Sequence, residues 1–265
     1  MKIALMDSGI GLLAAAHEVR LLSPGADLVL SSDPDGMPWG PRTPQDVTGR
    51  ALAVARAAAA HRPDALIIAC NTATVHALPT LRAVLEPGLP VIGTVPAIKP
   101  AAAEGEPFAI WATPATTGSP YQRGLIRDFA ASAEVTEVPC PGLADAVDRA
   151  DDVAIGRAVA AAAALTPPGV RTVVLGCTHY ELVEERIRDA LRRRPGSAEP
   201  VLHGSAGAVA AQALRRAAGS APAGAPDAPA GGRLTVLLSG RGSTLPEAAL
   251  AYAQGRLLAT VGQPH

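Results

Sequence analysis

The sequence predicts an α/β fold made of two similar, doubly wound domains with mostly parallel sheets and an active site in the cleft between them. Short apolar runs rich in β-branched residues alternate with Ala-rich helical stretches. Each apolar run is nearly continuous, as expected for a strand that is covered on both faces. One pattern of apolar strand, small residue, Cys and two polar residues occurs twice, at Cys70 and Cys177, which are 107 positions apart.

The expected strands are short, and turn residues or helical stretches separate them along the chain. They cover Ile3–Met6, Asp27–Leu30, Ala65–Ala69, Val91–Val95, Phe108–Ala112, Val135–Val138, Thr172–Leu175 and Leu234–Leu238. The expected helices lie between them, and this alternation is typical of a parallel sheet. They cover Leu12–Leu22, Pro44–Ala60, Val75–Leu85, Tyr121–Ala131, Val153–Leu165, Glu181–Arg194, Gly207–Ala217 and Pro246–Leu258.

We expect the second domain to be inserted into the first. Residues 1–97 together with 207–265 would form one domain, and residues 98–206 the other. The segment 219–232 contains only Gly, Ser, Ala, Pro and one Asp. That composition indicates a flexible loop without chemistry of its own.

Composition excludes several classes of protein. The 265 residues are 48% apolar and 18% charged, which provides for a buried core and excludes disorder as the main state. The net charge of −1 offers no basic excess for a nucleic acid partner. No apolar run is long enough to span a bilayer, and the first residues lack the apolar stretch of a signal peptide. We therefore expect a cytoplasmic protein with no membrane partner.

The three cysteines cannot all pair with one another, and no Cys-x-x-Cys occurs. A disulfide framework is therefore not expected. Cys177, Thr178 and His179 could begin a metal site, but no second Cys/His pair completes four ligands. We expect no metal.

Cys70 and Cys177 each follow a strand and precede a helix. Backbone amides at a helix N-terminus stabilise a thiolate, which can act as a nucleophile or a base. A cysteine can also be a small buried apolar residue. Two cysteines in matched contexts favour a function, whereas Cys140, between two prolines, is interpreted as structural. Two thiols facing one substrate suggest that one removes a proton and the other delivers one to the opposite face, which inverts a stereocentre without a cofactor.

A set of short motifs, in order and spacing from Met1 to about Ala210, resembles the glutamate racemase family of cofactor-independent amino-acid racemases. The motifs are Asp7-Ser8-Gly9-Ile10-Gly11, Pro38-Trp39-Gly40, Ala69-Cys70-Asn71-Thr72-Ala73, Pro96-Ala97-Ile98-Lys99-Pro100, Ala112-Thr113-Pro114-Ala115-Thr116, Cys140-Pro141-Gly142-Leu143 and Leu175-Gly176-Cys177-Thr178-His179-Tyr180.

The resemblance implies a role for each matching residue. Cys70 would be the base for the D-enantiomer and Cys177 the base for the L-enantiomer. Asp7 and His179 would assist the respective thiols, and Asp148 falls where the family has an acidic residue. The α-ammonium and carboxylate groups would be bound by Asn71, Thr72, Thr116 and Thr178. The side-chain carboxylate would be held by Ser8 and the turn Pro38, Trp39 and Gly40.

Simpler interpretations stay open for several of these residues. Asp7 can cap the helix that follows the first strand, since Asp is a favoured N-cap residue. His179 can be an ordinary residue at a helix start, and Asp148 an exposed acid. The side chains of Asn71, Thr72, Thr116 and Thr178 can be caps only, and those of Asn71 and Thr178 can serve both as caps and as ligands.

The sequence also departs from the family pattern near the expected side-chain pocket. Leu12 replaces a Gly, Trp39 replaces a Tyr, and Thr113-Pro114-Ala115-Thr116 replaces Thr-x-Gly-Thr. A late Asp-Ser-Gly is replaced by His203-Gly204-Ser205. These changes bear on the identity of the substrate more than on the reaction.

The prediction is therefore cofactor-independent racemisation of glutamate, as used in peptidoglycan synthesis. One alternative is a racemase or epimerase for another amino acid in specialised metabolism. A second is a non-catalytic binding protein with the same fold, and a third is a cysteine hydrolase, which would leave one of the two thiols unexplained. The expected partner is a small amino-acid substrate, and a homodimer is left open. No metal, pyridoxal phosphate or nucleotide is implied, because the glycines after the first strand do not complete a Gly-x-Gly-x-x-Gly pattern.

Overall fold

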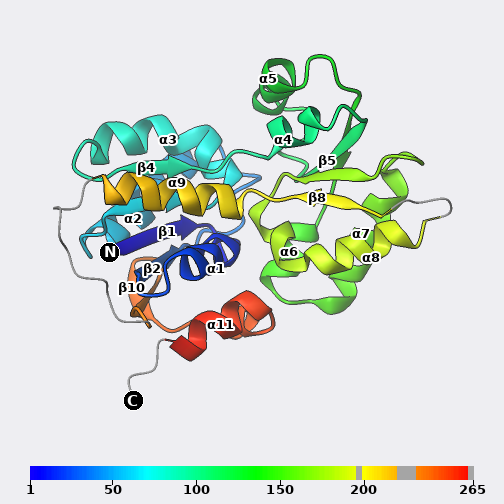
Figure 1. Cartoon of the computed structure of the whole chain (residues 1–265). Helices are drawn as coiled ribbons and strands as arrows, with labels where there is room; N and C mark the ends of the chain where they lie inside the picture. Colours follow the sequence, from blue (N-terminus) through cyan, green and yellow to red (C-terminus); the bar gives the residue numbers. More distant parts are fainter. Residues whose placement is uncertain (195–198, 220–230, 262–265) are drawn as a thin grey trace. The chain divides into compact units, whose positions relative to one another are not determined.

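Two units make up the part of the chain that the computed structural model describes, which is residues 1–194, 199–219 and 231–261. Unit 1 is Met1–Thr94 with the described part of Ala206–His265, and unit 2 is Val95–Ser205. Figure 1 shows the strands and helices of both. Of the expected loop 219–232, residues 220–230 lie outside the described residues.

The sheet of unit 1 has six strands in the order β10-β9-β2-β1-β3-β4. All neighbours are parallel except β10, which runs antiparallel to β9. The strands are β1 (Lys2–Asp7), β2 (Asp27–Ser32), β3 (Ala65–Ile68), β4 (Val91–Gly93), β9 (Leu234–Leu238) and β10 (Arg241–Ser243). The side chains of β1 and β3 are almost entirely buried, because helices cover both faces of these strands.

Two groups of helices pack on the central strands of unit 1. Helix α1 packs against α9 and α11, helix α2 packs against α3, and α1, α2 and α9 all contact β1. The helices are α1 (Leu12–Leu22), α2 (Pro44–Ala59), α3 (Asn71–Leu85), α9 (Ala206–Ala218), α10 (Glu247–Leu250) and α11 (Ala253–Val261). Between α2, α3 and the sheet, the core consists mainly of Val, Leu, Ile and Ala, together with Met6, Cys70 and one large ring, Trp39.

The sheet of unit 2 has four parallel strands in the order β6-β5-β7-β8. They are β5 (Phe108–Ala112), β6 (Val135–Pro139), β7 (Thr172–Leu175) and β8 (Val201–His203). The helices are α4 (Ile98–Ala103), α5 (Pro120–Phe129), α6 (Leu143–Asp148), α7 (Asp152–Leu165), the 3₁₀ helix η1 (Thr178–Val183) and α8 (Glu184–Arg192).

The two sheets repeat one topology. In unit 1 the first four strands of the chain stand in the order second, first, third, fourth, and the four strands of unit 2 stand in the same order. Each cysteine of the repeated motif follows the third strand of its unit. The predicted fold class of two similar, mostly parallel α/β domains is confirmed.

Several short elements differ from the sequence-based expectation. Strands β8 and β10 have three residues each, and helices α4 and α6 have six each. Such elements are too short to show a periodic pattern of apolar residues. The expected helix Glu181–Arg194 is instead the 3₁₀ helix η1 followed by α8, and α3 starts at Asn71 rather than Val75.

Candidate active site

Polar side chains gather at the carboxyl edge of the unit 1 sheet. Asp7 is the last residue of β1 and is completely buried, and the Ser8 hydroxyl donates to Asp7 Oδ1 at 3.5 Å. On the neighbouring strand β3, the Ala69 N–H donates to the Met6 carbonyl at 2.8 Å. Asp7 and Cys70 therefore leave two adjacent strands at the same edge, where ligands of parallel sheets bind.

The backbone places Cys70 at the start of α3. Cys70 is extended, with φ −149° and ψ 120°, and its carbonyl accepts the Thr74 N–H at 2.9 Å. Helix α3 is 15 residues long, and the N–H groups of its first turn point toward its N-terminus, where Cys70 lies. This end of a helix stabilises negative charge, including that of a thiolate. Asn71, which is buried, and Thr72, which is half-buried, form the first turn of this helix.

Unit 2 repeats this geometry around Cys177. Gly176 N–H donates to the Trp111 carbonyl at 2.7 Å, as Ala69 does to Met6 in unit 1. A Cβ at Gly176 would lie 2.8 Å from that carbonyl oxygen, so the close approach of β5 requires glycine. Cys177 has φ −142° and ψ 134°, nearly the values of Cys70, and precedes η1.

A histidine and a carboxylate accompany the thiol of Cys177. His179 Nδ1 lies 3.9 Å from Cys177 Sγ, and His179 Nε2 lies 3.2 Å from Asp148 Oδ1. The side chain of Asp148, at the end of α6, is 14% exposed and that of His179 is 7% exposed. The line of carboxylate, imidazole and thiol can move a proton from sulfur to nitrogen, because the carboxylate orients the ring and stabilises its charged form.

Two buried threonines lie at the same edge of the unit 2 sheet. Thr178 is the first residue of η1, directly after Cys177. Thr116 follows β5, and its hydroxyl lies 3.2 Å from that of Thr113. Because β5 and β7 are adjacent parallel strands, these hydroxyls and Cys177 share one edge.

Cys140 lies in a different chemical environment. It is 2% exposed, and its Sγ–H donates to the Val138 carbonyl at 3.6 Å. Burial raises the pKa of the Cys140 thiol to about 12. The thiol therefore stays protonated at neutral pH and cannot serve as a base there.

The turn Pro38, Trp39 and Gly40 belongs to unit 1, and its aromatic ring packs inward. Trp39 is 1% exposed, and its Nε1–H donates to Asp33 Oδ2 at 3.1 Å. Leu12, the first residue of α1, is 3% exposed. Leu12 and Trp39, two of the departures from the family pattern, are therefore both held in packing.

Comparison with known proteins assigns the family. A model of the Asp/Glu/Hydantoin racemase family matches residues 11–213. The chain belongs to this family. The matched residues include both Cys70 and Cys177, each with the polar residues that follow it.

Named relatives of this racemase-family chain are glutamate racemases. The glutamate racemase of Roseiflexus sp. is 36% identical over 193 residues, which is 70% of each chain. That of Vibrio campbellii is 38% identical over 200 residues, which is 72% of each chain. Among solved structures, Escherichia coli glutamate racemase in complex with L-glutamate and an activator is 25% identical with a TM-score of 0.79, covering 98% of this chain and 95% of that one.

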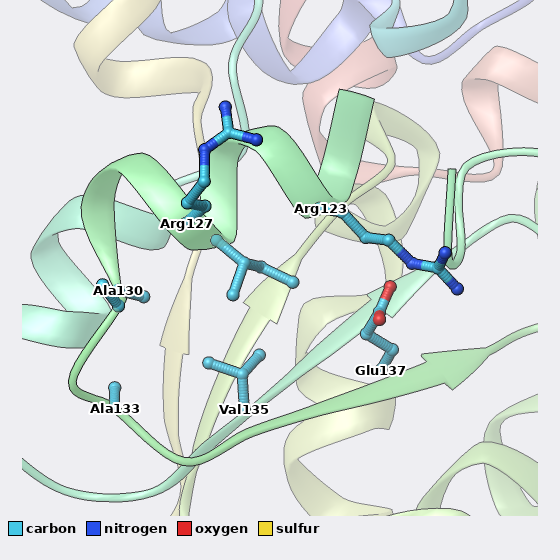
Figure 2. A pocket seen from close by; sticks show the side chains of 8 residues that line it. Arg123, Arg127, Ala130, Ala133, Val135 and Glu137 are labelled. Carbon is cyan, nitrogen blue, oxygen red and sulfur yellow. The ribbon is translucent and has the colours of Figure 1, made fainter. Parts of the chain in front are cut away.

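Unit 2 has a pocket of about 360 Å³, and none of the residues that line it is a predicted site residue. It lies between α5 and β6, with Arg123 and Arg127 on the helix and Val135 and Glu137 on the strand. Figure 2 shows Arg123 reaching toward Glu137. Glu137 Oε2 also accepts the Gly118 N–H at 2.7 Å and the Gln122 side-chain amide at 2.8 Å, so the carboxylate is already part of the local structure.

The part of the chain that the structure describes contains no candidate metal site and no candidate membrane-spanning helix. Among residues 1–194, 199–219 and 231–261, no three His, Cys, Asp or Glu side chains form a group that could hold a metal ion. Within the same ranges, no helix has the length and apolar character needed to cross a membrane. The three thiols are free of disulfide bonds.

Sequence reasoning missed two acidic residues close to the predicted ones. Asp33 follows β2 and accepts the Trp39 indole N–H. Glu181, two residues after His179, accepts both the N–H and the hydroxyl of Ser205 at 2.9 Å. For Asp33 a signal existed, because Ser31, Ser32 and Asp33 place polar residues where an apolar strand ends.

Proposed function

We propose that this chain interconverts L- and D-glutamate without a cofactor, using Cys70 and Cys177 as a pair of acid–base groups. The observation that carries the proposal is the repeated geometry of two thiols, each after the third strand of its unit and each with an extended backbone. Membership of the racemase family and the relatives named glutamate racemase support the same reaction.

In the proposed reaction a thiolate on one face of the substrate takes the Cα proton, and the C–H electron pair becomes a carbanion delocalised into the α-carboxylate. The opposite thiol then donates its proton to the other face of Cα. Product and substrate differ only in configuration, and the two sulfurs have exchanged protonation states. Cys70 acts on the D-enantiomer and Cys177 on the L-enantiomer.

Neighbouring groups support the proton transfers in this proposal. Asp7 assists Cys70, and His179, oriented by Asp148, takes up and returns the proton of Cys177. The hydroxyls and amide of Asn71, Thr72, Thr116 and Thr178 bind the α-ammonium and α-carboxylate groups. The burial of Asn71, Thr116 and Thr178 favours this role, because hydrogen bonds to a charged group are strong where water is excluded.

The side-chain carboxylate of glutamate is assigned to Ser8 and the turn Pro38, Trp39 and Gly40. Proline and glycine shape the turn so that backbone N–H groups can bind an anion. The burial of Trp39 and Leu12 supports glutamate as the substrate, since neither side chain is free to fill the space of an acidic side chain. The same proposal includes a cytoplasmic location.

A chiral assay on a panel of L-amino acids tests the substrate. We expect racemisation of glutamate with much lower rates on aspartate and on uncharged amino acids. Incorporation of deuterium at Cα in heavy water tests for a working base, which a binding protein with this fold would lack. The absence of turnover on either acidic amino acid would show that the proposed substrate is wrong.

Dialysis against a chelator tests the cofactor part of the proposal. We expect the rate to stay unchanged after dialysis, and we expect no bound chromophore in the absorption spectrum. A rate that falls with chelation and returns with added metal would assign Cys177 and His179 to a metal instead.

A further inference from the structure

Asp33 occupies the carboxyl edge of the unit 1 sheet that also carries Asp7 and Cys70. It follows β2, which lies beside β1, and its N–H donates to the Ser8 carbonyl at 3.2 Å. Ser8 is one of the residues assigned to the side-chain carboxylate of the substrate. The main chain of Asp33 is therefore tied directly to that part of the proposed site.

The side chain of Asp33 collects donors from three separate segments. Oδ2 accepts the Trp39 indole N–H at 3.1 Å and Arg50 Nη1–H at 3.2 Å. Oδ1 accepts the Ser239 hydroxyl at 3.2 Å. The carboxylate is 8% exposed, so these hydrogen bonds are largely shielded from water.

The backbone around the turn is built to admit this carboxylate. A Cβ at Gly36 would lie 2.0 Å from Asp33 Oδ2 and 2.2 Å from Arg50 Nη1. Gly36 N–H donates to the Asp33 carbonyl at 3.0 Å, and the Gly36 carbonyl accepts Arg42 Nε–H at 2.6 Å. The chain from Asp33 to Trp39 is thus folded back over its own carboxylate.

The charge of Asp33 is balanced where it lies. The guanidinium of Arg50 faces Oδ2, and Arg50 is in turn held by Asp46 at 3.2 Å. An anion neutralised in this way repels a nearby substrate carboxylate much less than a bare carboxylate would. The same atom that Arg50 neutralises also holds the indole of Trp39.

We propose that Asp33 is the positioning residue for recognition of the substrate's acidic side chain: by holding the Trp39 indole and the Ser8 backbone, it fixes the turn Pro38, Trp39 and Gly40 so that its N–H groups face the carboxylate. The inference rests on the proposed function. It predicts that Asp33 affects binding of the side-chain carboxylate and leaves the proton transfers at Cα largely unchanged.

The test compares Asp33→Asn, Trp39→Phe and the double variant. Asp33→Asn keeps the shape and removes the charge, and Trp39→Phe removes only the N–H donor and part of the ring. We expect each single variant to raise KM for glutamate about tenfold while kcat changes less than about threefold, the pattern of lost ground-state binding. In the double variant the two effects should sum to less than the single effects added together, because Trp39→Phe removes the donor of the hydrogen bond that Asp33→Asn weakens at its acceptor.

A second readout separates positioning from general damage. The inhibition constant of norvaline, which has the carbon chain of glutamate but ends in a methyl group, should stay the same in Asp33→Asn. The control is Asp46→Asn, which removes a carboxylate from the same Arg50 without touching Trp39. Thermal unfolding of all variants reports any loss of stability, and a folded Trp39→Phe protein keeps the test decisive if Asp33→Asn unfolds.

Each outcome bears on the inference. If the wild type racemises glutamate but Asp33→Asn lowers only the melting temperature, with KM and the norvaline inhibition constant unchanged, Asp33 is purely structural and the inference is wrong. The same holds if the effects of the two substitutions simply add. If the wild type turns over no acidic amino acid, the proposed function and this inference both fail.

Discussion

Cys70 and Cys177 leave their sheets at equivalent points with nearly the same backbone angles, yet their surroundings differ. The residue before each cysteine donates to the carbonyl of the first strand of its unit, at Met6 in unit 1 and at Trp111 in unit 2. The residue after Met6 is Asp7, and the equivalent residue after Trp111 in unit 2 is Ala112, which has no functional side chain. The repeat fixes the position of the sulfur but not the group beside it.

The helices that follow the cysteines differ in the same way. Cys70 precedes a 15-residue α-helix, whose first amides stabilise negative charge. Cys177 precedes a 3₁₀ helix of six residues, which offers little of this effect, and has His179 at 3.9 Å instead. Cys70 therefore lies at a helix terminus, on the strand next to the one that ends at the buried Asp7, whereas Cys177 lies next to an imidazole that contacts its own carboxylate.

The strongest test of the equivalence of the two thiols is to remove each in turn. We expect Cys70→Ala and Cys177→Ala each to lower the racemisation rate by at least about 10²–10⁴-fold, the usual loss of an acid–base group. The Cys70→Ala protein should still exchange the Cα proton of L-glutamate in heavy water without inversion, and Cys177→Ala that of D-glutamate. Chiral chromatography with mass spectrometry measures both quantities.

Near-wild-type racemisation by either of these variants would refute the two-thiol mechanism. Cys140→Ala provides the matched control, since it removes a third thiol that lies outside both motifs. It should retain inversion and exchange with both enantiomers.

The second test exploits the difference between the two thiols. His179→Ala should reduce kcat/KM by about 10²-fold, equally in both directions because the two enantiomers have equal energy. The different effects of His179→Ala on Cys177 and Cys70 should appear in the rates at which the two thiols react, since these rates depend on the fraction of each thiol that is ionised. Alkylation of Cys177 by iodoacetamide at pH 7 should slow while that of Cys70 keeps its rate, as peptide mapping would show.

His76→Ala is the control for this substitution, because His76 is an exposed residue of α3 and belongs to neither site. Equal slowing at both cysteines in His179→Ala would mean that the imidazole does not serve Cys177 in particular.

A smaller effect is expected at Asp148, which acts through His179. Asp148→Asn should lower kcat/KM about tenfold, since a hydrogen bond between charged groups contributes roughly 1.5–3 kcal/mol. Asp145→Asn removes the same charge one turn earlier on α6 and should change the rate little. Steady-state kinetics on both variants decides whether Asp148 assists catalysis or is an ordinary surface acid.

The sequence alone predicted eight strands and the alternation that defines the fold, because buried parallel strands are continuous apolar runs. It could not predict β8, whose three residues carry no pattern. At the site, the cysteines were visible because polar residues follow an apolar strand. For Asp33 the same kind of signal was present, but its role could not be predicted, because its partners Trp39, Arg50 and Ser239 are brought together by the fold, and Ser239 is 206 residues away.

The smallest predicted effect concerns Cys140, the thiol that shares neither environment. Burial raises its pKa from the ordinary 9.0 to about 12, so the folded protein holds this proton more tightly than the unfolded chain. The contribution of this shift to the free energy of unfolding is constant below about pH 9, where the thiol is protonated in both the folded and the unfolded protein. It is lost as pH rises from about 9 toward 12, because only the unfolded chain then releases the proton.

Denaturant unfolding of wild type and Cys140→Ala at several pH values between 7 and 10.5 tests this prediction. At pH 7 we expect Cys140→Ala to be less stable by about 1 kcal/mol, the cost of a small cavity. Above about pH 9 the wild type should lose stability more steeply than the variant, by at most about 1.4 kcal/mol per pH unit. The half-buried Tyr121 and the buried Tyr180, whose pKa values are also raised, are present in both proteins, so the difference in slope reports Cys140. Parallel pH curves would show that Cys140 ionises as an ordinary thiol and that its separation from the two catalytic candidates rests on position alone.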